Sequence, residues 1–191
     1  MTTVDAGAEH VSATSPYAWP FDGRLDPRAT AAVVVRPASV EWPDSGSGYA
    51  VAGVAVVNAI RAAGGGVISV ITADPGAVPP EHVQGEFDAD SVVISRGIDG
   101  FYASALDDVL RAARIARLVL VGFGLETCVH STMRSANDRG YECLLVSDAC
   151  EPYDPDLVAA SVSMIEMSGG IFGAVGQSAA VLDAFTARSE K

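Results

Sequence analysis

The sequence predicts an α/β protein of three layers, built around a parallel sheet of about six strands. Two observations support this prediction. Short, β-rich apolar runs recur along the chain, and segments with helical spacing of apolar residues lie between them. A continuously apolar run is typical of a strand buried on both faces of a parallel sheet. The alternation of strands and helices along most of the chain favours right-handed crossovers between parallel strands.

The apolar runs and the helical segments give the elements in order. The predicted strands cover residues 31–35, 67–71, 92–94, 118–121 and 144–146, with a final strand near 171–175. The predicted helices cover residues 49–63, 103–113, 126–139, 155–167 and 178–186. Glycines at 64–66 stop the first helix, Gly140 closes the third and Gly169 closes the fourth. These positions support the helix bounds, because glycine readily adopts the left-handed conformation that ends a helix.

The length of 191 residues fits one domain. Residues 1–16 are small, polar and aperiodic, which predicts a flexible N-terminal arm and excludes His10 from the site. Residues 17–191 then form a single domain. Residues 73–90 contain three prolines and form the one long loop expected after the arm. Long loops in compact domains are often functional.

Composition and charge limit the possible partners. Twenty-four acidic residues against 12 basic ones give a net charge of −12, so nucleic acid and anionic membranes are not expected as partners. No apolar run is long enough to span a bilayer, and the N-terminus has no basic signal region, so a cytoplasmic location is expected. The three histidines show no paired ligand spacing, and no metal or cofactor is expected.

The three cysteines, Cys128, Cys143 and Cys150, show no Cys-x-x-Cys spacing and cannot all pair within one chain. Cys128 follows the end of a predicted strand and a glycine-containing turn, and it lies in the first turn of a helix. Free N–H groups and the helix dipole would stabilise a thiolate there. The alternative is a small apolar side chain packed under the turn. Cys143 is expected to be structural, and Cys150 has no identified base.

The residues around Cys128 resemble those of a known family. The segment 122–141, GFGLETCVHSTMRSANDRGY, resembles the nucleophile segment of the isochorismatase-like cysteine hydrolases, and is most similar to the branch of biuret and ureidoacrylate amidohydrolases. The segments YAWPFDGRLDP, FYASALDDVLR and GGIFGAV are similar to the same branch. The resemblance covers residues 16–187, with a shortened region at 73–90. It implies the isochorismatase-like, Rossmann-like fold, a small-molecule substrate, no cofactor and a homo-oligomer.

The resemblance also implies a Cys-Lys-Asp triad, in which the cysteine attacks a C–N carbonyl, the aspartate transfers the proton and the lysine supports the charge. The cysteine falls on Cys128, but Arg36 occupies the aspartate position and Ser95, beside Arg96, the lysine position. A guanidinium has a pKa above about 12 and no acceptor lone pair, so Arg36 cannot be the general base. It could lower the pKa of a nearby thiol or bind a carboxylate. Candidate replacements for the base are His82, His130, Glu126, Glu41 and Asp44.

The turn 123–125 resembles the place where the family bends its backbone, commonly through a non-proline cis peptide. By that resemblance the N–H groups of Leu125 and Cys128 would form an oxyanion hole. The alternative is an ordinary tight turn that needs Gly124 for its backbone angles. We expect one of Phe101 and Tyr102 to line the pocket and the other to belong to the core. The expected substrate-binding residues are Arg36, Arg96, Phe101, Tyr102 and Gly124.

Two functions follow from these residues. The first is a cofactor-free cysteine hydrolase of amide or ureide C–N bonds, acting through a covalent acyl intermediate on Cys128. The second is a catalytically silent relative that binds a small carboxylate through Arg36 or serves as a subunit of an assembly. Similarity along the whole chain favours the first function. The loss of both triad partners favours the second, because the loss of general acid–base help alone costs about 3 to 5 kcal/mol of barrier. Both functions therefore stay open.

Overall fold

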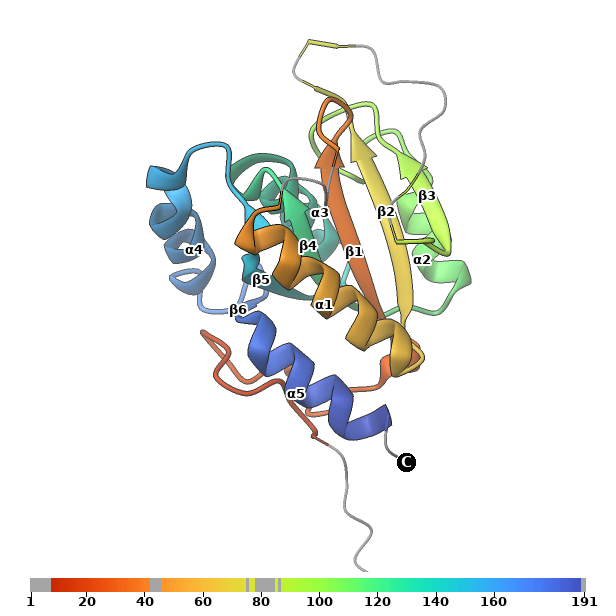
Figure 1. Ribbon diagram of the computed structural model, residues 1–191, viewed down its shortest axis with the longest axis vertical. Coiled ribbons are helices and arrows are strands. Elements are labelled where there is room, and N and C mark those ends of the chain that lie inside the picture. Colours follow the sequence, from red (N-terminus) through yellow and green to blue (C-terminus); the bar gives the residue numbers. More distant parts are fainter. Residues whose placement is uncertain (1–7, 42–45, 75, 78–84, 86, 190–191) are drawn as a thin grey trace, which may run out of the picture.

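The computed structural model describes residues 8–41, 46–74, 76–77, 85 and 87–189. Six parallel strands form one sheet in the order β3-β2-β1-β4-β5-β6 (Figure 1). The strands are β1 (Thr30–Pro37), β2 (Gly66–Thr72), β3 (Ser91–Ile94), β4 (Arg117–Phe123), β5 (Glu142–Glu151) and β6 (Ala174–Gly176). The predicted α/β architecture and the six-stranded parallel sheet are confirmed.

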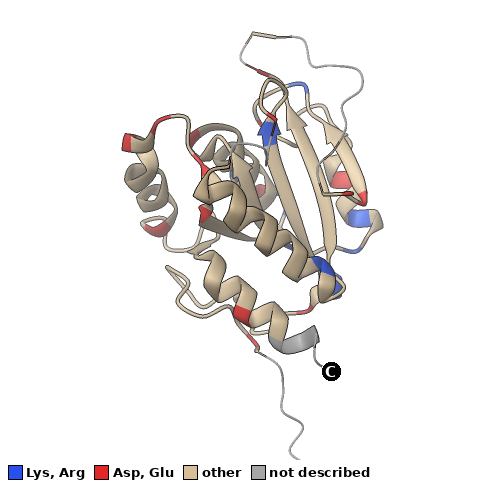
Figure 2. Cartoon of the chain, viewed as in Figure 1, with Lys and Arg blue, Asp and Glu red and all other residues tan. Residues whose placement is uncertain are grey.

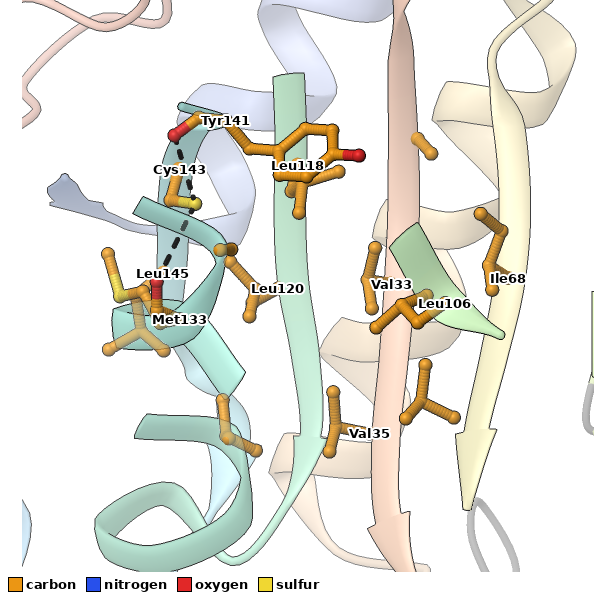
Figure 3. Close-up of a cluster of buried hydrophobic side chains, with 14 of the residues drawn as sticks. Val33, Val35, Ile68, Leu106, Leu118, Leu120, Met133, Tyr141, Cys143 and Leu145 are labelled. Atoms are coloured by element: carbon orange, nitrogen blue, oxygen red, sulfur yellow. Dashed lines mark hydrogen bonds between the residues drawn. The ribbon is translucent and has the colours of Figure 1, made fainter. Parts of the chain in front are cut away.

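Helices cover both faces of the sheet and give the three predicted layers. The helices α1 (Gly48–Ala62) and α5 (Ser178–Ser189) pack on one face (Figure 1). The helices α2 (Leu106–Ala112), α3 (His130–Asp138) and α4 (Val158–Glu166) pack on the other. Each face has its own apolar core. Figure 3 shows the core under α2 and α3, where Val33 and Leu120 of the sheet lie near Leu106 and Met133 of the helices.

The central strands are apolar on both faces because helices cover both. All eight residues of β1 are buried, as are six of the seven residues in β2 and in β4. Side chains alternate along a strand, so Val33 and Val35 belong to the core under α2 and α3, while Ala32 and Val34 belong to the core under α1 and α5. This pattern is the structural basis of the continuous apolar runs.

Two predicted elements differ in detail. The helix predicted at 126–139 is divided into a π-helical turn, η2 (Leu125–Val129), and the regular helix α3. The strand predicted at 144–146 extends over ten residues, and its pairing with β4 shifts in register between Leu120 and Gly122. Both irregularities lie at the carboxyl end of β4, next to Cys128. Short helical turns also precede β1 and α4, at η1 (Pro27–Ala29) and η3 (Pro155–Leu157).

The expected flexible arm is wrong for residues 8–16. Val11 is buried and bridges Trp19, and Ser15 exchanges two backbone hydrogen bonds with Val175, at 2.9 and 2.7 Å. The segment therefore pairs antiparallel with the edge strand β6 and covers part of the core, which composition alone does not predict. Residues 1–7 lie outside the described residues.

In the view of Figure 2 the acidic residues lie on several different helices and loops. None of the helices in the described part of the chain is long and apolar enough to cross a membrane.

Candidate functional site

Two glycines shape the turn that carries Cys128. Gly122, at the end of β4, has φ +143°, and a Cβ there would lie 1.9 Å from the Val35 carbonyl oxygen. Gly124 has φ +82°, and a Cβ there would lie 2.8 Å from Cys128 Sγ. The chain can therefore leave β4 and enter η2 close to β1 only because both side chains are absent. This turn places Cys128 at the carboxyl edge of the sheet, where open α/β folds bind ligands.

The Cys128 thiol is buried, with 2% of the residue exposed. Its sulfur donates a hydrogen bond to the Phe123 carbonyl oxygen at 2.9 Å, and a longer contact of 3.8 Å joins it to the Gly124 carbonyl oxygen. A thiol that donates to carbonyl oxygens is in its neutral form. The surroundings therefore favour the protonated sulfur.

Burial raises the pKa of Cys128 from its ordinary value of 9.0 to about 11. The hydroxyls of Thr72 and Thr127 and the backbone N–H groups of Val129 and Cys128 act in the opposite direction and lower it. Desolvation exceeds these contributions. The sequence-based expectation of a stabilised thiolate at the start of a helix is thus opposed by the depth at which the sulfur lies.

The sulfur borders a cavity of about 100 Å³. Its described lining comes from the ends of several strands and the loops after them: Pro37, Thr72, Ala73, Ile98, Thr127, Cys128 and Tyr153. No charged side chain belongs to this described lining. Ligand pockets are usually about 300 to 1,000 Å³, and a dry cavity of about 150 Å³ holds benzene. The space next to Cys128 thus admits a ligand of only a few heavy atoms.

Arg36 lies at the end of β1 but outside the described lining. It is 4% exposed, and its Nη1 donates to the Pro37 carbonyl oxygen at 3.1 Å. The register pairs Pro37 with Thr72, and both of these residues line the cavity. Side chains alternate along a strand, so Arg36 lies on the opposite face of β1 from Pro37. The substrate-binding role expected for Arg36 remains a prediction.

Ser95, at the lysine position, is fully buried and organises the loop after β3. Its hydroxyl lies within hydrogen-bond distance of the carbonyl oxygens of Gly97, Asp99 and Tyr102, at 3.1, 2.5 and 3.1 Å. It also accepts a hydrogen bond from the Gly97 N–H at 3.1 Å. The neighbouring Arg96 is exposed. Ser95 therefore fixes a loop and presents no charge to the cavity.

Phe101 belongs to the core and Tyr102 to the surface. Phe101 stacks on Tyr141 with ring centroids 6.0 Å apart, and the Arg139 guanidinium lies 4.6 Å from the Phe101 ring centroid. Tyr102 is 62% exposed. Neither is part of the described lining, so their predicted roles in binding find no geometric support. Ile98, from the same loop, takes the place expected for one of them.

Tyr153 and Ile98 line the cavity although the sequence analysis did not identify them. Both follow the carboxyl end of a strand, β5 and β3 respectively, and that position is the signal that could have found them. Phe101 and Tyr102, which were expected to contribute to the pocket, lie in the same loop as Ile98 but a few residues later.

None of the described candidate bases contacts the sulfur. Glu126 accepts hydrogen bonds from the backbone N–H groups of Tyr153 and Asp154, at 3.2 and 2.8 Å. His130 is 6% exposed, its Nε2 has no hydrogen-bond partner among the described residues, and burial together with Arg134 lowers its pKa. Glu41 is exposed, while His82 and Asp44 lie outside the described residues. Within the described chain, no carboxylate or imidazole hydrogen-bonds to Cys128 Sγ.

The remaining site predictions concern the turn and the other thiols. The amides of Thr127 and Val129 donate to the Gly124 carbonyl oxygen, and an oxyanion hole at Leu125 and Cys128 stays a prediction. The cis peptide that the resemblance suggested for this turn is absent: cis bonds in the described chain precede Pro16 and Pro20.

The other two thiols are fully buried, and burial raises the pKa of both Cys143 and Cys150. Cys143 contacts the carbonyl oxygens of Tyr141 and Met133 (Figure 3). These contacts agree with its predicted structural role. The part of the chain that the structure describes holds no group of three or more His, Cys, Asp or Glu residues that could bind a metal ion.

Comparison with known sequences supports the resemblance. The isochorismatase domain pattern matches residues 55–179. A ureidoacrylate amidohydrolase from Agrobacterium fabrum is 32% identical over 102 residues, which cover 49% of this chain and 45% of that protein. The same enzyme from Acinetobacter baylyi is 38% identical over 66 residues, covering 35% and 27%. The matched segments thus span less than half the length of these relatives.

Comparison with solved structures agrees on the fold. A cysteine hydrolase from Pseudomonas syringae pv. phaseolicola superposes with a TM-score of 0.67 at 22% identity, covering 86% of this chain and 95% of that one. N-carbamoylsarcosine amidase from Thermoplasma acidophilum gives a TM-score of 0.59 at 24% identity, covering 78% and 96%. At these identities the likeness concerns the fold.

Proposed function

The chain belongs to the isochorismatase family, and on that premise we propose that it binds a small, uncharged carbonyl compound beside Cys128 without hydrolysing it at the rate of a triad-bearing relative. The observation that carries this proposal is the state of the sulfur. Cys128 donates to a carbonyl oxygen and has no acid–base partner among the described residues. A cavity and a buried thiol lie together, and no acid or base among the described residues hydrogen-bonds to the sulfur.

The magnitudes support the same conclusion. With a pKa of about 11, roughly one thiol in 10⁴ is ionised at neutral pH. Lack of a general base costs a further factor of about 10² to 10⁴ in rate. Acylation of Cys128 by an amide would therefore be slow on both counts.

The ligand class follows from the lining. Its polar groups are hydroxyls and the thiol, all of them neutral, and the rest of the lining is apolar. An uncharged amide or ureide satisfies hydroxyl groups through its carbonyl and amino groups, whereas a carboxylate would lose its hydration without meeting a cation among the described lining residues. This favours a neutral ligand over the carboxylate that Arg36 suggested.

A cysteine hydrolase of small amides or ureides, with Cys128 as nucleophile and a degenerate triad, is the second candidate. The observation that favours it is the retention of a thiol on the cavity with the N–H groups of Val129 and Cys128 close enough to lower its pKa. Two of the proteins compared above are named as an amidohydrolase and an amidase. In this case the base would come from outside the described residues, where His82 and Asp44 are the candidates.

Ammonia release from urea, acetamide and biuret separates the two functions. We expect the purified chain to release ammonia no faster than its Cys128→Ala variant, while acetamide binding is detected by NMR titration. Ala73→Leu should abolish that binding by filling the cavity, and Val51→Leu, on the exposed face of α1, should not. Release that disappears in Cys128→Ala would establish the hydrolase instead, and its further loss in His82→Ala or Asp44→Ala would identify the base.

A further inference from the structure

Tyr153 lies between the cavity and solvent. It follows β5, lines the cavity beside Cys128 and is 49% exposed. Its ring packs edge-on against Phe123, with centroids 4.8 Å apart and an interplanar angle of 85°. The Phe123 carbonyl oxygen accepts the Cys128 thiol hydrogen bond. One residue of the turn thus contacts both the thiol and the tyrosine.

Gly124 allows the thiol and the tyrosine to approach each other. A Cβ at this position would lie 2.8 Å from Cys128 Sγ and 3.1 Å from Tyr153 Cε2. The sulfur and the ring edge therefore flank the same bare Cα atom. Any ligand in contact with the sulfur is also close to the tyrosine ring.

Glu126 fixes the backbone of Tyr153 to the turn that carries the thiol. Its two carboxylate oxygens accept the N–H groups of Tyr153 and Asp154, at 3.2 and 2.8 Å. Glu126 lies two residues before Cys128 in η2. The carboxylate that the sequence offered as a base thus acts as a clamp between η2 and the loop before η3.

The phenol of Tyr153 is protonated at neutral pH. Burial raises the pKa of Tyr153 to about 12, and Cys128, Asp74 and Glu126 act in the same direction. Asp74 accepts hydrogen bonds from the N–H and hydroxyl of Ser39, at 3.1 and 2.5 Å. At neutral pH the phenol is a hydrogen-bond donor, and two carboxylates close to it disfavour an anionic ligand.

We propose that Tyr153 donates the hydrogen bond that recognises the ligand carbonyl beside Cys128, and that Glu126 is the positioning residue that holds it there. This inference rests on the proposed function, because it requires a carbonyl ligand in the cavity. It assigns ligand recognition to a tyrosine after β5, and it makes the site selective for an uncharged carbonyl over its carboxylate counterpart.

Acetamide, acetate and xenon test the assignment on the full chain. Tyr153→Phe keeps the ring and removes only the hydroxyl, so acetamide should bind about three- to tenfold more weakly by NMR titration. Xenon, which fills apolar cavities without hydrogen bonds, should bind equally to both proteins. Acetate should bind the unmodified chain at least about tenfold more weakly than acetamide, since carboxylates disfavour it. The assignment would be overturned if Tyr153→Phe bound acetamide as tightly as the unmodified chain. It would also be overturned if the variant lost xenon binding to the same extent as acetamide binding.

The clamp has a matched control. Glu126→Gln should weaken acetamide binding and leave xenon binding unchanged, because only one of its two backbone contacts can be kept. Glu142→Gln alters a similar carboxylate contact, to the Phe21 N–H at 3.0 Å, at the opposite end of β5, and should change neither. If the unmodified chain binds xenon but no amide, the proposed function fails. If it binds acetamide and the Glu126 and Glu142 variants behave alike, only the clamp is wrong.

Discussion

The pH dependence of Cys128 alkylation tests the protonation state on which the proposed function depends. The thiolate is the species that reacts with iodoacetamide. A free cysteine with the ordinary pKa of 9.0 is about 1% ionised at pH 7, whereas a pKa of about 11 leaves about 0.01%, a deficit of about 100-fold. A thiolate of higher pKa is more nucleophilic. With a Brønsted coefficient of about 0.4 to 0.5, the higher pKa increases the rate constant of the thiolate about six- to tenfold, which offsets part of the deficit. The net rate at neutral pH should be about tenfold or more below that of free cysteine.

The shape of the profile is more informative than the rate, because limited access to a buried sulfur lowers the rate at every pH. The logarithm of the Cys128 alkylation rate should rise by about one per pH unit until about pH 10, whereas the rate of a free cysteine levels off above about pH 9. Mass spectrometry of the chain after timed exposure gives the rate at each pH. Cys128→Ala is the control for labelling of Cys143 and Cys150. A plateau below about pH 8 would refute the reasoning, because it would require a cation or base near the sulfur.

Three further predictions concern the turn, the lysine position and the buried imidazole. Gly124→Ala should cost about 2 to 4 kcal/mol in urea unfolding, because strain at positive φ and a clash with the sulfur add. Gly140→Ala, at φ +87° with nothing within 4 Å, should cost only about 1 to 2 kcal/mol, and equal costs would contradict this account. Ser95→Lys should destabilise the fold by more than Ser95→Ala, since it loses the same hydrogen bonds and buries an ammonium group. Burial lowers the pKa of His130 below 6.5, so the unfolded chain binds the proton more tightly and stability is lost as pH falls below 6.5 towards the folded-state pKa. His130→Gln should therefore gain stability relative to the unmodified chain between about pH 7.5 and 5, and a constant difference over that range would show that the imidazole is not perturbed.

The fold was predictable because its strands are buried on both faces. Short, continuous apolar runs such as residues 31–35 are typical of strands buried on both faces, and glycines mark where the helices end. The pairing of Ser15 with Val175 was not predictable, because an edge strand accepts a partner through its backbone, which leaves no pattern in side-chain composition. The π-helical turn at Leu125–Val129 was also not predictable from periodicity, since it follows the left-handed backbone of Gly124, which leaves no pattern of apolar side chains.

The site was predictable in position but not in composition. The carboxyl ends of parallel strands identified Cys128, and the family resemblance identified the turn around it. Ile98 and Tyr153 were missed, because a single apolar or aromatic residue in a loop resembles any other until its distance from the sulfur is known. The protonation state of Cys128 could not be predicted from the sequence. N–H groups at the start of the helix lower the pKa of the thiol and desolvation raises it, so the depth of burial decides the outcome.

The contacts of Ser95 show what this residue does at the position where the family resemblance implies a lysine. Its hydroxyl has one proton to donate and lies within hydrogen-bond distance of the carbonyl oxygens of Gly97, Asp99 and Tyr102. It also accepts from the Gly97 N–H, and these contacts hold the loop that carries Ile98 to the cavity. A lysine in its place would have to leave this network, and the loop that supports Ile98 would lose its anchor. In this chain the loop supplies Ile98 to the described lining of the cavity, as the proposed binding function requires.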